Sequence, residues 1–111
     1  MRYASEEELA ARANPFYRIV SWAMDRNLLE GSTPKDQLCK LVEEVGELAD
    51  GIGKIDVNEI ADAIGDCAVV LTILAAQYSL DFERCVEVTY NEIKDRKGRM
   101  VDGMFVKEED A

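Results

Sequence analysis

The sequence predicts a single all-α domain, a four-helix-bundle-like fold with a short C-terminal hairpin or tail. Apolar residues recur at spacings of three and four in four successive segments. Residues that start or stop helices separate these segments. No internal repeat or linker divides the 111 residues, so residues 1–111 are treated as one domain with its core at about 15–100.

The first helix is expected to open at Asn14-Pro15, a helix-capping residue followed by proline at the first helical position. Its apolar positions run from Phe16 to Leu28. Residues 6–13 could form a separate short helix. Gly31 and Pro34 then end the first helix and allow a second to begin.

The second helix is expected to end near Gly51 to Gly53, and its apolar positions are Leu38, Leu41, Val42, Val45, Leu48 and Ile52. A third helix should run from about Val57 to Gln77. Because its second half is apolar on nearly every side, it should lie in the middle of the bundle.

Asp81 can cap a fourth helix, expected over about Phe82 to Lys97. Val86, Tyr90 and Ile93 recur on one side of this segment, which predicts that they face inward. Beyond it, Asp102-Gly103 is typical of a hairpin turn, so residues 100–107 should form a hairpin or an ordered tail.

Composition narrows the classes of function. Thirteen basic and 23 acidic residues give a net charge of -10, which argues against binding a nucleic-acid polymer through its phosphates. The N-terminal residues lack the positive start and apolar run of a signal peptide. The apolar stretch 61–78 is too short and too often interrupted to span a bilayer. We therefore expect a cytoplasmic protein without a membrane segment.

Three cysteines, Cys39, Cys67 and Cys85, are far apart in apolar helical patterns. This arrangement predicts reduced core residues better than disulfides. A zinc site is not expected, because no cysteine pair has ligand spacing and histidine is absent.

Acidic residues on two successive helices indicate a metal site. Glu44 and Glu47 are three residues apart and share one face of the second helix, while Asp62 and Asp66 share a face of the third. Asp66 is followed by apolar residues and is expected to be partly buried, which would require a cation or a hydrogen-bond donor. Mg²⁺ meets this need, because it accepts carboxylate oxygens and completes its shell with water and phosphates.

Two other interpretations of these acids fit the sequence less well. Acidic pairs at helical spacing are commonly solvated surface residues, although the apolar neighbours of Asp66 argue against that here. A carboxylate-bridged di-iron bundle is set aside, because its usual pattern includes Glu-x-x-His and the chain has no histidine.

The segments Glu43-Glu44-Val45-Gly46-Glu47-Leu48 and Asp62-Ala63-Ile64-Gly65-Asp66 resemble the MazG-like branch of the all-α NTP pyrophosphohydrolases. The resemblance covers roughly residues 35–100. It implies that acids of a Glu-Glu-x-x-Glu and a Glu-x-x-Asp motif bind Mg²⁺ and hydrolyse nucleoside triphosphates to monophosphates and pyrophosphate.

This sequence departs from the second motif, because Ala63 stands where the family usually has Glu. Asp62, four residues before Asp66, faces the same side and could replace it. Reading Glu59-Ile60-Ala61-Asp62 as the motif is an alternative, but the context after Gly65-Asp66 resembles the family more closely. The expected ligands are therefore Glu44, Glu47, Asp66 and, as ligand or outer acceptor, Asp62. Glu43 is expected to be a ligand or a water-orienting base.

A basic segment follows the acids. By resemblance, Asn91 and Lys94 are expected to contact phosphates, with help from Lys97 or Arg99. Without the acidic motifs, cations near a helix C-terminus would explain this cluster better. Trp22 or Phe16 could stack on a base, although core packing is the commoner role of aromatic residues on a helix face.

These observations predict a Mg²⁺-dependent, or Mn²⁺-dependent, pyrophosphohydrolase acting on ribo- or deoxyribonucleoside triphosphates for control of nucleotide pools. Spare apolar residues and the resemblance imply a homodimer or homotetramer. The alternative is a non-catalytic helical interaction protein that retains an acidic cluster, and Ala63 is its main support.

Overall fold

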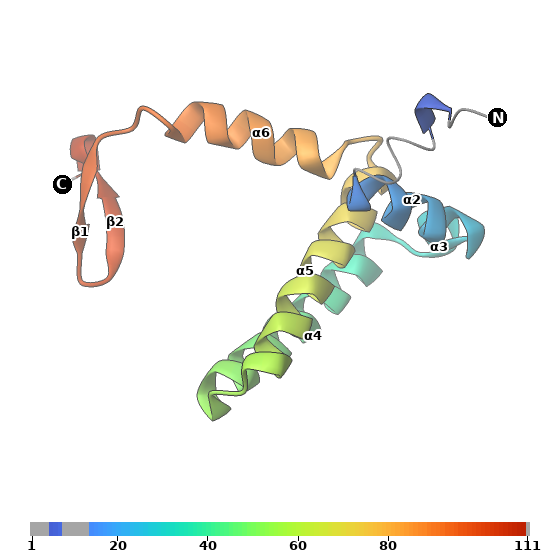
Figure 1. Ribbon diagram of the computed structural model, residues 1–111, viewed down its shortest axis with the longest axis horizontal. Helices are drawn as coiled ribbons and strands as arrows, with labels where there is room; N and C mark the ends of the chain where they lie inside the picture. Colours follow the sequence, from blue (N-terminus) through green and yellow to red (C-terminus); the bar gives the residue numbers. More distant parts are fainter. Residues whose placement is uncertain (1–4, 8–13, 111) are drawn as a thin grey trace.

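The computed structural model describes residues 5–7 and 14–110 (Figure 1). Its elements are α2 (Pro15–Asp25), α3 (Leu28–Gly31), α4 (Pro34–Lys54), α5 (Val57–Gln77), α6 (Phe82–Ile93), β1 (Gly98–Val101), β2 (Met104–Lys107) and the 3-10 turn η1 (Glu108–Asp110). The long helices α4 and α5 run antiparallel, and α2 and α3 pack at one end of this pair. The predicted all-α fold with a C-terminal hairpin is confirmed. The proposed helix within residues 6–13 lies largely outside the described residues.

The first helix begins as predicted and ends early. The Asn14 side chain accepts hydrogen bonds from the backbone amides of Phe16 and Tyr17. The helix stops at Asp25 because Asn27 adopts a left-handed conformation with φ of 57°. Asparagine tolerates this conformation, which interrupts the helical hydrogen-bond pattern. The expected continuation to Leu28 is therefore wrong, and Leu28 instead starts the one-turn helix α3.

The α4–α5 pair is closed by a connection of two residues. Ile55 has φ of 57°, and the Asp56 amide donates to the carbonyl of Gly51, which ends α4 in a Schellman motif. A Cβ on Gly51 would lie 3.2 Å from the backbone nitrogen of Ile60, so glycine permits the close approach of the two helices here. The side chain of Asp56 then caps α5 by accepting from the Glu59 amide.

The small core is centred on α5. Its buried residues Ala63, Val70, Thr72 and Ile73 lie against α4 and α2, with Ala23 buried on α2. Two glutamine side chains hold Ser32, which lies just before α4, in place through hydrogen bonds. The Gln77 side chain donates to the Ser32 carbonyl at 2.7 Å, and that of Gln37 donates to the Ser32 hydroxyl at 2.9 Å. α5 therefore occupies the central position that its apolar pattern predicts.

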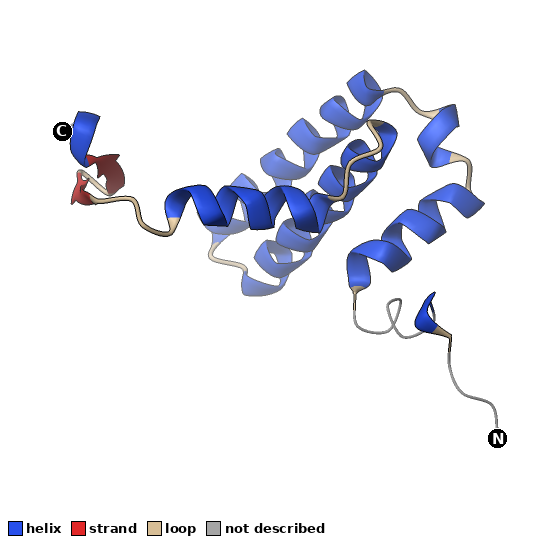
Figure 2. Ribbon diagram, turned by 90° about the horizontal axis from the view of Figure 1, so that it is seen from above, coloured by secondary structure: helices blue, strands red, loops and turns tan. Residues whose placement is uncertain are grey.

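The C-terminal arm, residues 82–110, leaves this pair (Figures 1 and 2). Helix α6 is capped by Asp81 as predicted but ends at Ile93, so the expected extension to Lys97 is wrong. The hairpin pairs Gly98 with Lys107 through Val101 with Met104, and Asp102 and Gly103 form its turn with φ of 49° and 82°. Both turn residues have the positive φ that a tight hairpin turn of this kind requires.

Much apolar surface stays open in the single chain. Val86, Tyr90 and Ile93, expected to face inward, are exposed because α6 projects away from α5. The radius of gyration is 17.5 Å, whereas a compact domain of this length has about 13 Å. The three cysteines are free as expected, but Cys39 and Cys85 are exposed and do not belong to the core. No helix in the described part of the chain is long and apolar enough to cross a membrane.

Candidate metal centre

Three carboxylates from α4 and α5 meet at one point. Glu44 and Glu47 lie one turn apart on α4, and Asp66 faces them from α5. Each contributes one carboxylate oxygen, and the three oxygens lie within 4.8 Å of one another. We call this group the acid trio. The antiparallel packing of α4 and α5 therefore brings together three of the four residues expected to bind the metal.

Glu44 is the buried member of the acid trio. It is 5% exposed, and its Oε2 atom has no hydrogen-bond partner among the described residues. The prediction that Asp66 is the buried carboxylate is wrong, because Asp66 is exposed. Helix α5 instead turns Ala63 and Val70 inward, which leaves Asp66 at the edge of the contact with α4.

The carboxylates perturb one another. Loss of hydration raises the pKa of Asp66, and the charges of Glu44 and Asp62 raise it further. The pKa of Glu47 is also raised, first by a hydrogen bond with Glu44 and then by the Glu44 charge. The nearby Lys40 opposes both shifts. The acid trio therefore favours a proton or a cation over three free negative charges.

Two further predicted acids border the acid trio. Asp62 lies outside it but close enough for its charge to raise the pKa of Asp66. The Glu43 side chain is 60% exposed, and its Oε1 atom lies 3.6 Å from Lys40 Nζ. Ala63, at the position where the resemblance leads one to expect Glu, is 2% exposed and packs in the core.

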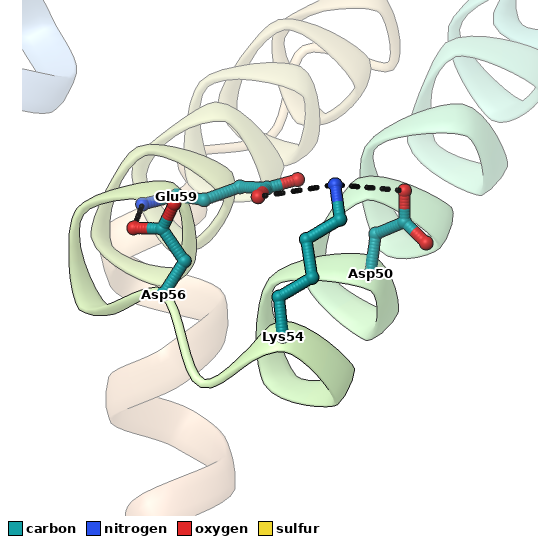
Figure 3. Close-up of polar contacts among 4 residues, drawn as sticks. All are labelled: Asp50, Lys54, Asp56 and Glu59. Atoms are coloured by element: carbon teal, nitrogen blue, oxygen red, sulfur yellow. Dashed lines mark hydrogen bonds and ion pairs between the residues drawn. The ribbon is translucent and has the colours of Figure 1, made fainter.

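Glu59, the residue of the alternative motif, has a different setting. Its Oε2 atom lies 3.7 Å from Lys54 Nζ, and the same ammonium lies 3.8 Å from Asp50 Oδ2 (Figure 3). These contacts link the end of α4 to the start of α5. Asp66, and not Glu59, belongs to the acid trio.

The predicted phosphate contacts lie on the C-terminal arm. Asn91 is in the last turn of α6, Lys94 follows its end, Lys97 precedes β1 and Arg99 lies within β1. All four are exposed. Because α6 runs away from the α4–α5 pair, the single chain does not bring them to its own acid trio (Figure 1).

The two aromatic candidates differ in environment. Phe16 is half-buried and packs edge-on against Phe82, with ring centroids 5.3 Å apart. Trp22 is 45% exposed and borders an apolar groove of about 400 Å³ with Ile19 and Val69. Val69 lies three residues after Asp66, so this groove adjoins the face of α5 that carries the carboxylate. Of the two aromatic candidates, Trp22 therefore has the more open surface.

Sequence reasoning missed Lys40. Its Nζ atom lies 3.2 Å from Glu44 Oε1, which makes it the basic partner of the buried acid. The signal was present, because Lys40 precedes Glu43 and Glu44 by three and four residues on the same helix.

The donor set suits a hard divalent cation. Carboxylate oxygens are the preferred ligands of Mg²⁺ and Mn²⁺, and a buried oxygen without a donor is costly unless a cation or water satisfies it. Glu44 Oε2 is such an oxygen.

Comparisons with known proteins identify the family of this chain. The model of the MazG nucleotide pyrophosphohydrolase domain matches residues 32–101, which include the acid trio. The chain is 54% identical over 63 residues to an uncharacterized 18.2 kDa protein in the rep-hol intergenic region of Haemophilus phage HP1. That match covers 57% of this chain and 39% of the phage protein. No solved structure matches significantly. With most of its length matched by the family model, the chain belongs to the MazG nucleotide pyrophosphohydrolase domain family.

Proposed function

We propose that this chain hydrolyses nucleoside triphosphates to nucleoside monophosphates and pyrophosphate with the help of Mg²⁺ or Mn²⁺. The observation that carries the proposal is a buried Glu44 oxygen that has no hydrogen-bond partner within residues 5–7 and 14–110, in a carboxylate cluster whose oxygens from Glu44, Glu47 and Asp66 lie within 4.8 Å of one another. Family membership gives the reaction class. The acid trio provides oxygen ligands for the ion.

Each acid has a proposed part in the reaction. Glu44, Glu47 and Asp66 hold the cation, and Asp62 holds it directly or accepts a hydrogen bond from its water. When bound, the ion offsets charge on the triphosphate and lowers the pKa of a coordinated water. Glu43 is exposed beside the acid trio and can orient the attacking water. Attack on phosphorus breaks the bond between the α and β phosphates, and pyrophosphate leaves.

Substrate binding is proposed to need a second copy of the chain. At least half of each of the side chains Leu38, Val42, Val45 and Ile52 on α4 is exposed, and α6 carries the exposed Val86, Tyr90 and Ile93. Burying such faces is the usual reason for symmetric self-association. In a homodimer or homotetramer, the partner's Lys94 and the partner's Asn91 could contact phosphates beside the acid trio, while Trp22 stacks on the base.

A nucleotide panel tests the proposal. The full chain is incubated with ribo- and deoxyribonucleoside triphosphates and Mg²⁺, and pyrophosphate and monophosphate are measured. Glu47→Gln should reduce release about 100-fold, because the ligands of a catalytic ion act as a unit. The matched control Asp50→Asn changes an exposed acid of the same helix outside the acid trio and should keep activity. If no nucleotide is hydrolysed, or if Glu47→Gln matches the wild type, the enzyme proposal is rejected.

Mixing two inactive variants tests whether a second copy of the chain contributes residues to the active site. If the partner's Lys94 completes the site, Glu47→Gln and Lys94→Met should each be inactive alone and partly active together, since mixed oligomers contain one intact site. Light scattering after size-exclusion chromatography gives the oligomeric state. A monomer, or a mixture without activity, would contradict a shared site.

A helical interaction protein without turnover remains the alternative. The observation that favours it is Ala63, which has no carboxylate where the family usually has one and is buried against α4. Under this alternative the protein would self-associate and bind the ion, and every nucleotide of the panel would remain intact.

A further inference from the structure

Lys40 occupies a distinctive place beside the acid trio. Its ammonium lies 3.2 Å from Glu44 Oε1 and 3.6 Å from Glu43 Oε1. It is half exposed, whereas the Glu44 side chain that it contacts is only 6% exposed. Lys40 is therefore a solvent-reachable cation attached to a buried anion.

The ion pair between Lys40 and Glu44 partly offsets the repulsion among carboxylates in the metal-free protein. A buried carboxylate needs a counter-charge or donors, and Glu44 already has Glu47 and Asp66 beside it. Lys40 supplies a counter-charge, because its Nζ atom lies 3.2 Å from Glu44 Oε1. It neutralises the acid trio only in part, because none of the residues that the structure describes donates a hydrogen bond to Glu44 Oε2.

A divalent cation and Lys40 would use the same carboxylate. A cation bound to the acid trio would be coordinated by the Glu44 carboxylate and would repel the nearby Lys40 ammonium, since like charges a few ångströms apart interact unfavourably. The Lys40 side chain is flexible and half exposed, so it can move into water. Its attraction for Glu44 is then lost.

We propose that Lys40 is a positioning residue that provides the counter-charge of Glu44 in the metal-free protein and competes with the divalent cation for that carboxylate. The inference rests on the proposed function, because it assumes that the acid trio binds the ion. Lys40 thereby holds the Glu44 side chain in place before the metal arrives, at the expense of metal affinity.

The test measures Mn²⁺ binding to the full chain without nucleotide, from the electron paramagnetic resonance signal of free Mn²⁺. Lys40→Met should bind Mn²⁺ roughly twofold to fivefold more tightly than the wild type, the range expected when one partly exposed opposing charge is removed. Its thermal unfolding midpoint in EDTA should fall, because Glu44 loses its counter-charge. Lys40→Arg keeps the charge and should behave like the wild type in both measurements.

Lys54→Met is the matched control. Lys54 is also on α4 and also contacts two acids, Asp50 and Glu59, but neither belongs to the acid trio (Figure 3). Its loss should leave Mn²⁺ affinity unchanged.

The outcomes separate this inference from the proposed function. If the wild type binds Mn²⁺ but Lys40→Met binds it equally well or more weakly, Lys40 does not compete with the ion and the inference is overturned. If Lys54→Met tightens binding as much, the effect is general electrostatics and the inference again fails. If the wild type binds no Mn²⁺ at any concentration, the metal centre and the inference fail together.

Discussion

Replacing Glu44 by Gln should stabilise the metal-free protein while removing its response to metal. The substitution keeps the shape of the side chain and removes a buried negative charge whose Oε2 has no hydrogen-bond partner in the described part of the chain. The new amide group can donate hydrogen bonds to the carboxylates of Glu47 and Asp66, which lie within 4.8 Å. Repulsion between like charges is thereby replaced by attraction.

The magnitude follows from the burial of Glu44. An unsatisfied buried polar group costs about 1–3 kcal/mol, and more when it is charged. Part of this gain is offset by the lost pairing with Lys40, which is small because that ammonium is half exposed. We expect a net stabilisation of about 1–2 kcal/mol, which corresponds to roughly 5–10 °C in the unfolding midpoint for a domain of this size.

Thermal unfolding by circular dichroism at one protein concentration measures this effect, first in EDTA and then in excess Mg²⁺. The wild type should gain stability with Mg²⁺, because a ligand that binds only the folded state raises the midpoint. The Glu44→Gln variant should have a higher unfolding midpoint than the wild type in EDTA, and Mg²⁺ should raise that midpoint only slightly. If the midpoint of Glu44→Gln in EDTA is at or below that of the wild type, Glu44 does not destabilise the metal-free protein and the reasoning is refuted. An undiminished response to Mg²⁺ would show that the ion binds elsewhere.

Three other predictions concern pH, the choice of motif and the hairpin. The pKa of Glu47 and the pKa of Asp66 are raised in the folded protein. From about pH 4 upward, the folded protein therefore binds more protons than the unfolded chain. The unfolding free energy of the metal-free protein should fall as the pH rises from about 4 through the raised pKa values of these two acids. Urea unfolding in EDTA across this range would show it, and Mg²⁺ should reverse the trend. Asp66→Asn should lower pyrophosphate release about 100-fold and Glu59→Gln by less than about threefold, and the opposite order would favour the motif that begins at Glu59. Gly98→Ala should open the hairpin, because the new Cβ would lie 2.3 Å from the Val106 carbonyl oxygen, and amide exchange in β1 and β2 should become about tenfold faster. Unchanged exchange would show that the strands shift without separating.

The helix boundaries show what could be predicted from local signals. Asn14 and Asp81 cap their helices as expected, and Asp102-Gly103 forms the turn of the hairpin, because each acts through its own backbone or the next few residues. The break at Asn27 was missed, since asparagine occurs both inside helices and at left-handed positions. Ile55 was less predictable still, because a β-branched residue rarely adopts positive φ.

The candidate site, like the helix boundaries, could be predicted only in part from the sequence. Helical spacing was sufficient to put Glu44 and Glu47 on one face of α4, because residues three apart share a face, whereas the family resemblance was needed to bring Asp66 of α5 to them. Spacing could not tell that Glu44 is buried and Asp66 exposed, which depends on how α5 is rotated against α4. Nor could it place Lys94, whose position depends on the direction in which α6 leaves the pair.

The two-residue connection between α4 and α5 also bears on how the centre arises during synthesis. All three carboxylates belong to one continuous stretch, residues 34–77, with only a tight turn between its halves. Closing so short a loop costs little chain entropy, and contacts between sequence neighbours form early. We therefore expect a nascent chain to gather its carboxylates once α5 has emerged from the ribosome, before the arm has emerged.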